Sequence, residues 1–256
     1  MLRAFSTAAT GMTAQQMIVD TISNNLANIN TSGFKRSQVD FQDLMYVTLK
    51  EPDETTPTGL EIGSGVRPAS TTKVFTQGEM QNTGRSLDLA IEGGGFFKVT
   101  SAAGEARYTR DGSMRVDATG KLVTASGYVL DPAITIPADT RSINVAADGT
   151  VTVLAGSATT PTSAGQITLV RFANPSGLSS EGGNMLAETV ASGSPTTGAA
   201  AQGGFGSIQQ RFLEKSNVQM VRELVNLITA QRAYEINARA IRAGDEMLTT
   251  ANRLIS

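Results

Sequence analysis

The two ends of the chain carry long apolar stripes at coiled-coil spacing, whereas the middle of the chain does not. Residues 1–30 place an apolar residue at alternating steps of four and three, with one polar exception, and residues 217–256 do so with three polar exceptions. A repeat that averages about 3.5 residues keeps one side of a helix against a partner. The pattern predicts that the termini pair with each other, with neighbouring copies, or with both, as in a subunit that assembles.

The candidate assembly interface consists of stripe residues together with Asn28. Its residues are Phe5, Met12, Val19, Ile22, Leu26 and Asn28 from the N-terminal segment and Leu224, Leu227, Gln231, Tyr234, Ile241 and Leu248 from the C-terminal segment. The alternative is that the two stripes form an ordinary core. Two observations argue against an ordinary core. The first stripe is longer than most helices of globular proteins, and only the other terminus has enough helical character to pack against it.

The middle of the chain has the pattern of an antiparallel β domain. From residue 66 to about residue 170, short runs of alternating apolar and polar residues are separated by turn signals such as Asp111-Gly112 and Asp148-Gly149. We therefore predict an α+β fold, in which long N- and C-terminal helices pair as a coiled-coil-like stem beside a central antiparallel sandwich or partly closed barrel. The low-complexity segments 155–165 and 192–206 are expected to be flexible surface loops.

Four segments follow from these patterns. Residues 1–45 are predicted to be an N-terminal helical assembly segment, with a first helix that ends near Gly33 and a second amphipathic stretch at 39–49. Residues 46–65, rich in Pro and Gly, are an extended arm, and residues 66–206 are a β-rich outer domain. Residues 207–256 are a C-terminal helical assembly segment, whose helix Ser216 and Gln219 are expected to cap.

Composition narrows the classes of function. The chain has no cysteine and no histidine, which excludes disulfides, thiolate chemistry, Ser-His-Asp triads and histidine zinc sites. A net charge of −2 without a block of like charge argues against nucleic acid as a partner. Polar residues interrupt the N-terminal segment, so a cleaved secretory signal is not expected.

Carboxylates are the acid/base groups that remain. Asp111, Asp117, Asp131 and Asp148 lie beside Gly or Pro or within turn-like clusters, where Asp usually caps its own turn. We therefore predict no catalytic residue, no metal or cofactor site and no small-molecule substrate.

Both terminal segments carry motifs that resemble those of the flagellar rod and hook axial proteins. Residues 23–36, Ser-Asn-Asn-Leu-Ala-Asn-Ile-Asn-Thr-Ser-Gly-Phe-Lys-Arg, are similar to the N-terminal signature of that family, and residues 216–218 and 223–235 resemble its C-terminal motif. The matching N-terminal residues are Asn24, Asn25, Leu26, Ala27, Asn28, Thr31, Gly33, Phe34, Lys35 and Arg36. Segments 43–46, 59–66, 87–91 and 108–112 resemble distal rod subunits of the family in particular.

The resemblance implies a structural subunit of the distal rod, exported by the flagellar type III apparatus without a cleaved signal. Such subunits polymerise into a hollow helical shaft that crosses the periplasm to the outer membrane inside the P- and L-ring proteins, in contact with other rod and hook subunits. It also implies that the terminal helices form the inner tube, that the β domain faces outward and that the arm contacts neighbouring subunits. A proximal rod or hook subunit is the alternative within the family. A monomeric β-rich envelope binding protein or a carboxylate hydrolase is the alternative from another class.

Overall fold

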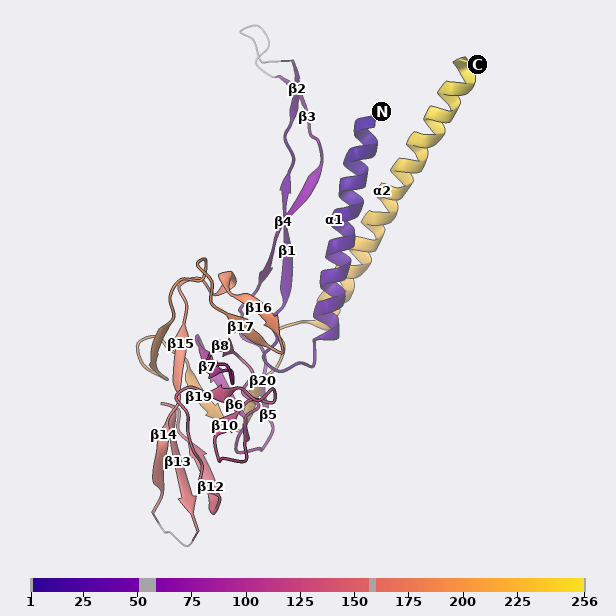
Figure 1. The fold of residues 1–256 in the computed structure, drawn as a ribbon. Coiled ribbons are helices and arrows are strands. Elements are labelled where there is room, and N and C mark those ends of the chain that lie inside the picture. Colours follow the sequence, from indigo (N-terminus) through magenta and orange to yellow (C-terminus); the bar gives the residue numbers. More distant parts are fainter. Residues whose placement is uncertain (1, 51–58, 157–159, 256) are drawn as a thin grey trace. The chain divides into compact units, whose positions relative to one another are not determined.

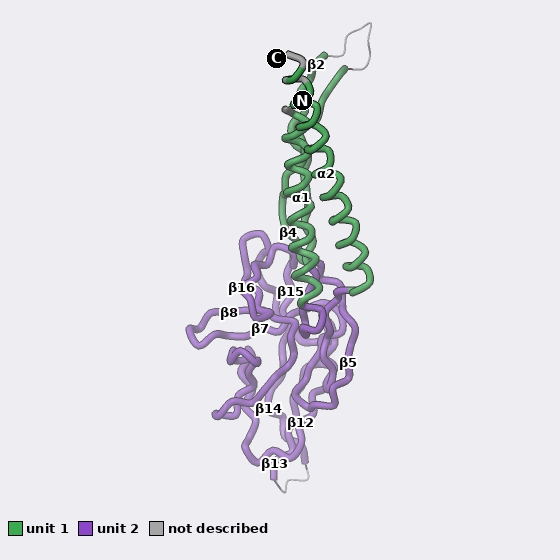
Figure 2. Tube along the Cα trace, turned by 90° about the vertical axis from the view of Figure 1, so that its right-hand side faces the viewer, with its two compact units in different colours: residues 1–27, 37–73, 219–256 green, residues 28–36, 74–218 purple. Residues whose placement is uncertain are grey.

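The structure is a computed structural model that describes residues 2–50, 59–156 and 160–255. The chain divides into two compact units (Figure 2). Unit 1 comprises Met1–Ala27, Ser37–Lys73 and Gln219–Ser256, and unit 2 comprises Asn28–Arg36 and Val74–Val218. The chain therefore passes between the units at 27/28, 36/37, 73/74 and 218/219.

Unit 1 contains both terminal helices, α1 at Leu2–Ala27 and α2 at Met220–Ile255 (Figure 1). The two helices run side by side in opposite directions, because Asn237 of α2 lies against Gly11 of α1, and Gly244 lies against the ring of Phe5. The prediction of long helices at both termini is confirmed. Among the described residues, neither helix nor any other combines the length and the apolar character that crossing a membrane requires.

The rest of unit 1 is a β ribbon. Strand β1, Ser37–Asp43, pairs antiparallel with β4, Val66–Lys73, and β2, Val47–Lys50, pairs with β3, Leu60–Ile62. The ribbon contacts α1 through β1 and β4. The prediction that the helical segment extends to residue 45 was wrong. Val39 and Phe41 alternate with polar residues, which is the period of a strand, and the Thr-rich segment of β4 pairs with them. Residues 51–58 of the arm lie outside the described residues.

Unit 2 consists of short antiparallel strands. They are β5 Met80–Asn82, β6 Leu89–Glu92, β7 Phe96–Thr100, β8 Ala106–Thr109, β9 Arg115–Val116, β10 Leu122–Val123, β11 Val129–Leu130, β12 Thr140–Val145, β13 Thr150–Ala155, β14 Thr162–Gln166, β15 Thr168–Arg171, β16 Ser179–Gly182, β17 Met185–Ala187, β18 Thr196–Ala199, β19 Ser207–Gln210 and β20 Phe212–Glu214, with a 3-10 turn η1 at Pro175–Gly177. The main sheet has the order β16-β17-β8-β7-β11-β10-β9, and β15 joins it by pairing with both β7 and β18. Strands β12, β13 and β14 form a second open sheet. The predicted central antiparallel β domain is confirmed.

Strand β7 has apolar side chains on both faces of the main sheet. Phe97 and Val99 point into the main core, together with residues of β6, β13 and β15. Phe96 points to the opposite face, where it packs edge-to-face against Phe172 at 6.0 Å between ring centroids. Tyr108 completes this second cluster at 4.7 Å from Phe172. Because successive side chains of a strand point to opposite faces, the run at 96–99 supplies both clusters.

The start of α2 differs from the prediction. Residues 207–214, assigned to the C-terminal helical segment, form β19 and β20, which pair with β6 and β5. The helix begins at Met220, so Ser216 does not cap it; the Ser216 hydroxyl instead accepts the N–H of Val218 at 3.3 Å. The carbonyl of Gln219 accepts the N–H of Glu223 at 3.0 Å and opens the helix.

The segment 192–206 is not a surface loop as predicted. It contains β18, and Ala200 is buried in the main core. Gly198 lies against the ring of Phe205, and a Cβ atom there would be 2.3 Å from a ring carbon. Small residues in this segment therefore permit close packing. In the other low-complexity segment, residues 162–166 form β14, and residues 157–159 lie outside the described residues.

Tyr108 provides a test of the second cluster. Its side chain is buried and its hydroxyl donates a hydrogen bond to Glu188 at 3.1 Å. Burial, with the neighbouring carboxylate, raises the pKa of Tyr108 to about 12, above its ordinary value of about 10. The folded protein favours the neutral phenol, so we expect its contribution to stability to be complete below about pH 10 and to be lost as the pH rises through about 12.

Tyr108→Phe cannot ionise, so the fall in stability across this pH range should be shallower than in the unmodified protein. Urea unfolding at a series of pH values measures the slope. Tyr46→Phe, at an exposed position, is the control for the effect of the Tyr-to-Phe change itself. Equal slopes for Tyr108→Phe and the unmodified chain would contradict the inference that ionisation of Tyr108 destabilises the folded protein at high pH.

Candidate assembly interface

One row of residues on α2 faces α1. The buried or half-buried members of this row are Leu227, Ala230, Asn237, Ile241, Gly244 and Leu248. The contacts of Asn237 with Gly11 and of Gly244 with Phe5 fix the register of the pair. Ala230 and Gly244 leave room for α1. The packing of α2 on α1 therefore depends on small side chains as well as on large apolar ones.

The opposite face of α2 is apolar at the start of the helix. Val221, Leu224, Val225 and Ile228 are between 40% and 76% exposed. With about 3.6 residues per turn, they lie on the side of the helix away from Ala230. Further along, the same face carries exposed charged residues, Arg232, Glu235, Arg239, Arg242 and Glu246. The exposed side of the start of α2 is therefore apolar, whereas the side that carries Ala230 begins with the buried Glu223. We call these four exposed residues the apolar face of α2.

The predicted stripe residues fall on more than one face. In α1, Ile22 is buried, and Phe5, Met12, Val19 and Leu26 are half-buried. In α2, Leu227, Ile241 and Leu248 belong to the row that faces α1, whereas Leu224, Gln231 and Tyr234 are exposed. That these residues contact another copy of the chain stays a prediction. Sequence reasoning missed Gly11, Ala230 and Gly244, because small residues add little to an apolar pattern.

Asn25 of the N-terminal motif joins the end of α1 to the start of β1. Its amide donates to the carbonyl of Ser37 at 2.9 Å, and its carbonyl accepts the N–H of Ser37 at 2.9 Å. The side chain is buried within unit 1. Of its motif neighbours, Asn24 and Ala27 are exposed, and Asn28 accepts a hydrogen bond from the hydroxyl of Thr31 at 3.2 Å. The Asn25 amide therefore bonds to the ribbon, and the Asn28 carbonyl oxygen accepts a local hydrogen bond.

Gly33 belongs to unit 2 and does not close α1, which ends at Ala27. Its φ angle is +70°, as the left-handed prediction required. Its N–H donates to the carbonyl of Glu214 at 2.8 Å. A Cβ atom at Gly33 would be 2.7 Å from the backbone nitrogen of Asp111, so only glycine fits both the space and the angle.

The last motif residues enter a buried charge cluster in unit 2. Lys35 lies 2.5 Å from one carboxylate oxygen of Glu214, and Arg110 lies 3.4 Å from the other. All three side chains are buried. Lys35 also donates to the carbonyl of Thr76 at 2.8 Å, and Glu214 accepts the N–H of Gly78 at 2.8 Å. Burial lowers the pKa of Lys35, and the Glu214 carboxylate opposes that shift.

The excess positive charge of this cluster is balanced by backbone oxygens. Arg110 donates to the carbonyl of Ile91 at 3.2 Å and to the carbonyl of Gly93 at 2.6 Å. Two cations thus share one carboxylate and three carbonyls. Phe34 and Arg36, on either side of Lys35, are half-buried. Nothing local in the sequence marks Glu214 or Arg110 as partners of Lys35, since Glu214 is 179 positions away.

The candidate carboxylates lie in turns or pair with a cation. Asp111 accepts the N–H of Ser113 at 3.0 Å, and Asp148 accepts the N–H of Thr150 at 2.9 Å. Asp117 accepts the N–H groups of Thr119 and Lys121, each at 2.8 Å. Hydrogen bonds from Thr119 and Lys121 lower the pKa of Asp117, and those from Thr150 lower the pKa of Asp148. Asp131 does not cap a turn and forms an ion pair with Lys98 at 2.7 Å.

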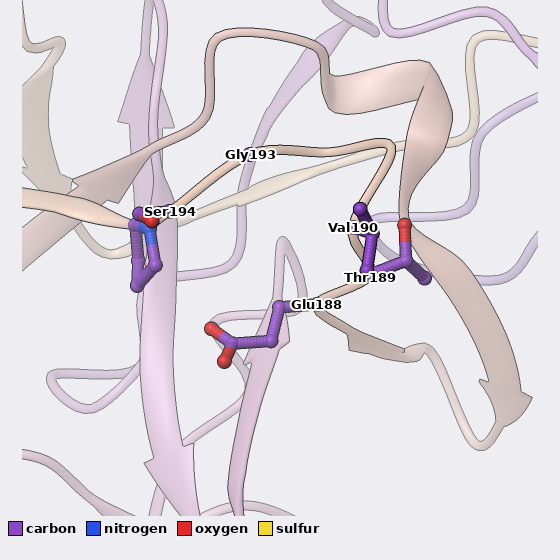
Figure 3. A pocket seen from close by; sticks show the side chains of 6 residues that line it. Glu188, Thr189, Val190, Gly193 and Ser194 are labelled. Carbon is purple, nitrogen blue, oxygen red and sulfur yellow. The ribbon is translucent and has the colours of Figure 1, made fainter.

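A surface hollow of about 550 Å³ lies along residues 188–195. Figure 3 shows the carboxylate of Glu188 between the side chains of Val190 and Ser194. Of the described residues that line the hollow, Glu188 is the single titratable one, and it accepts a hydrogen bond from Tyr108. Glycoside hydrolysis uses two carboxylates at a set separation, so this arrangement does not match that chemistry. Among the described residues, no three His, Cys, Asp or Glu side chains are placed to hold a metal ion.

Comparison with known proteins identifies the class. Three family descriptions match the chain: "Flagella basal body rod protein" at residues 5–35, "Flagellar hook protein FlgE/F/G D1 domain" at 90–153, and "Flagellar basal body rod FlgEFG protein C-terminal" at 209–254. The first match covers most of α1 and the N-terminal motif, and the second covers part of unit 2, which we also call the β unit. The third covers the end of unit 2 and most of α2. Paired terminal helices with a β unit between them, matched in this order, define an axial protein of the flagellum.

Full-length relatives give the family. The chain is 47% identical over 251 residues to the flagellar basal-body rod protein FlgG of Buchnera aphidicola subsp. Acyrthosiphon pisum, covering 96% of each chain. It is 45% identical over 262 residues to FlgG of Borreliella burgdorferi, covering 99% of each. It is 34% identical over 271 residues to the flagellar hook-basal body complex protein FlhP of Bacillus subtilis, covering 98% of this chain. The chain therefore belongs to the flagellar basal-body rod protein family.

The charge cluster makes a prediction about unit 2. Glu214→Gln leaves Lys35 and Arg110 buried without a counter-charge, so we expect it to destabilise unit 2 by about 3–5 kcal/mol. Urea unfolding followed by the fluorescence of the tyrosines measures the loss. The matched control is Glu235→Gln on α2, whose exposed pair with Arg239 spans 3.9 Å. The control should change stability by less than about 0.5 kcal/mol. Equal effects of the two variants would show that the buried cluster is not important for stability.

Proposed function

We propose that the chain is the structural subunit of the distal part of the flagellar rod and polymerises with copies of itself into a hollow helical shaft. The observation that carries this proposal is the apolar face of α2. Val221, Leu224, Val225 and Ile228 lie on the side of α2 away from α1, and that side is exposed within the chain. Burying an apolar side chain of this size stabilises an interface by about 1.5–3 kcal/mol. The full-length relatives named as rod proteins support the assignment.

In this proposal, α1 and α2 continue as a coiled-coil-like stem that lines the tube, and the β unit faces outward with its open sheets packed as a sandwich. The four segments 1–45, 46–65, 66–206 and 207–256 keep their proposed assembly roles, although their secondary structure differs from the prediction. The ribbon of β2 and β3 is the arm that contacts neighbouring subunits. Its exposed Leu49, Leu60 and Ile62 support that role, because an isolated two-stranded ribbon buries little of its own apolar surface.

The proposed partners are other rod and hook subunits, the P- and L-ring proteins and the flagellar type III export apparatus. The proposed location is the basal body, from the periplasm to the outer membrane, reached without a cleaved signal peptide. Membership of the rod family supports these partners and this location. A proximal rod or hook subunit is the second candidate. The distal assignment is favoured because the chain matches relatives named as FlgG along their whole length.

The other class, a monomeric envelope binding protein or carboxylate hydrolase, has less support. The hollow beside Glu188 offers a single carboxylate among the described residues that line it. We propose that the chain has no catalytic residue and takes no small-molecule substrate, cofactor or nucleic acid.

A charge on the apolar face of α2 should prevent assembly. Ile228 is half exposed in the single chain, so Ile228→Asp should leave the monomer folded and soluble. In a polymer the carboxylate would be buried at every copy, so rods should not form. Sedimentation and electron microscopy measure the polymer, and circular dichroism checks the fold. Leu227→Asp is a less specific test, because Leu227 belongs to the row that faces α1 within the chain.

Two control variants accompany this test. Ile228→Leu keeps the apolar surface and should assemble as the unmodified chain does. Thr196→Asp adds the same charge at an exposed position of β18 and should also assemble. If Ile228→Asp forms rods at the concentration at which the unmodified chain does, the apolar face of α2 is not the assembly interface.

The turn carboxylates test the enzyme alternative. Asp111 caps its own turn, so Asp111→Asn should leave a chain that folds and assembles. Incubation of the unmodified chain with peptidoglycan and with peptide substrates should yield no product. Turnover that Asp111→Asn, Asp117→Asn or Asp148→Asn abolishes would refute the structural assignment.

A further inference from the structure

Two asparagines hold adjacent residues at the point where the chain passes from unit 2 to unit 1. The passage lies between Arg36 and Ser37. Within unit 1, Asn25 bonds both the N–H and the carbonyl of Ser37, each at 2.9 Å. Within unit 2, Asn217 accepts the N–H of Arg36 at 2.8 Å. The carbonyl of Arg36 accepts the N–H of Val74 at 2.9 Å. The backbone N–H and carbonyl groups of Arg36 and Ser37 therefore each have a defined hydrogen-bond partner.

Asn217 also binds the second segment that passes between the units. Its amide nitrogen donates to the carbonyl of Val74 at 2.8 Å, to the carbonyl of Thr76 at 3.1 Å and to the hydroxyl of Thr76 at 2.8 Å. Val74 follows the passage at 73/74, and Asn217 itself precedes the passage at 218/219. One side chain therefore joins three segments of unit 2, each of which lies next to a passage between the units.

The charge cluster reinforces this arrangement. Lys35, directly before Arg36, donates to the same carbonyl of Thr76 that Asn217 contacts. Three side chains therefore hold the backbone from Lys35 to Ser37: that of Lys35 itself, that of Asn217 at Arg36 and that of Asn25 at Ser37. An amide suits both asparagine positions, because it carries a donor and an acceptor on one short, planar group. Aspartate lacks the donor, and leucine, which is branched at the same carbon but larger, lacks both.

We propose that Asn25 and Asn217 are positioning residues for assembly: they fix the backbone of residues 36 and 37 in one conformation as the chain leaves unit 2. The proposal rests on the function proposed above, because a subunit that repeats along a shaft requires the same chain path in every copy. In this proposal both terminal motifs contribute residues that hold this part of the backbone. The N-terminal motif supplies Asn25 and Lys35, and the C-terminal motif supplies Asn217.

The first measurement is local amide exchange in the full-length monomer, resolved by residue. In Asn217→Leu the amide of Arg36 loses its acceptor, and in Asn25→Leu the amide of Ser37 does. Each amide should exchange about tenfold faster, which corresponds to the loss of one net hydrogen bond. Amides of the main core, such as that of Phe97, should keep their rates. Asn30→Leu, at an exposed position of the same motif, is the control and should change neither site.

The aspartate variants separate hydrogen bonding from packing. Asn217→Asp keeps the acceptor for Arg36, so the amide of Arg36 should stay protected, although the bonds to Val74 and Thr76 are lost. Asn25→Asp should likewise protect the N–H of Ser37. A role in packing alone predicts instead that Asn217→Asp, which keeps the shape of asparagine, leaves exchange unchanged at every nearby amide, including those around Val74 and Thr76 whose bonds to Asn217 are lost. If circular dichroism shows that a leucine variant is unfolded, Asn217→Ser, whose side chain is too short to reach, replaces it in the same comparison.

The second measurement is assembly. The leucine variants should need about tenfold more protein to form rods than the unmodified chain, the equivalent of about 1.4 kcal/mol per subunit. Unchanged exchange at Arg36 and Ser37 would overturn the proposal whatever the rods do. Faster exchange with unimpaired assembly would overturn the positioning role and leave the proposed function standing. An unmodified chain that does not polymerise would instead refute the proposed function, and the exchange data would still decide whether the asparagines hold the backbone.

Discussion

The buried cluster of Lys35, Glu214 and Arg110 is the interaction on which the β unit depends most. It joins a residue of the N-terminal motif to one 179 positions later, with Gly33 and Gly78 held to the same glutamate. Buried charges are tolerated when each is paired and hydrogen-bonded, and here one carboxylate and three carbonyls serve two cations. The β unit is thus complete only when residues 28–36 and 74–218 fold together.

This dependence changes the interpretation of the terminal motifs. A signature at the end of a long helix suggests a helix–helix interface, yet its residues divide between two tasks. Residues up to Ala27 belong to the helical unit, where Asn25 bonds the start of β1. Residues 28–36 belong to the β unit, where Gly33 and Lys35 contact Glu214. Substitutions in the second half should therefore act first on the β unit.

The two faces of α2 explain how one helix can serve both the monomer and a polymer. One side packs on α1 through small residues such as Ala230 and Gly244, which permit a close approach. The other side is apolar in its first turns and charged beyond them. Apolar surface of this kind is costly to leave in water, whereas the charged turns are stable in solvent. An unpartnered apolar face confined to one end of a helix is consistent with a contact made only after assembly.

The sequence by itself determined the long terminal helices, the antiparallel β middle, the tight turns at Asp111 and Asp148, and the family. These features are local, because periodicity, turn residues and short motifs each act over a few neighbouring positions. The tertiary structure alone decided that 207–214 complete the β unit, that 192–206 pack into it and that 37–43, whose period of two is visible in the sequence, pair with 66–73. It also decided that Lys35 meets Glu214 and that Asn217 meets Arg36. Such pairings depend on which distant segments come together, and a pattern of neighbouring residues contains no record of a partner 179 or 181 positions away.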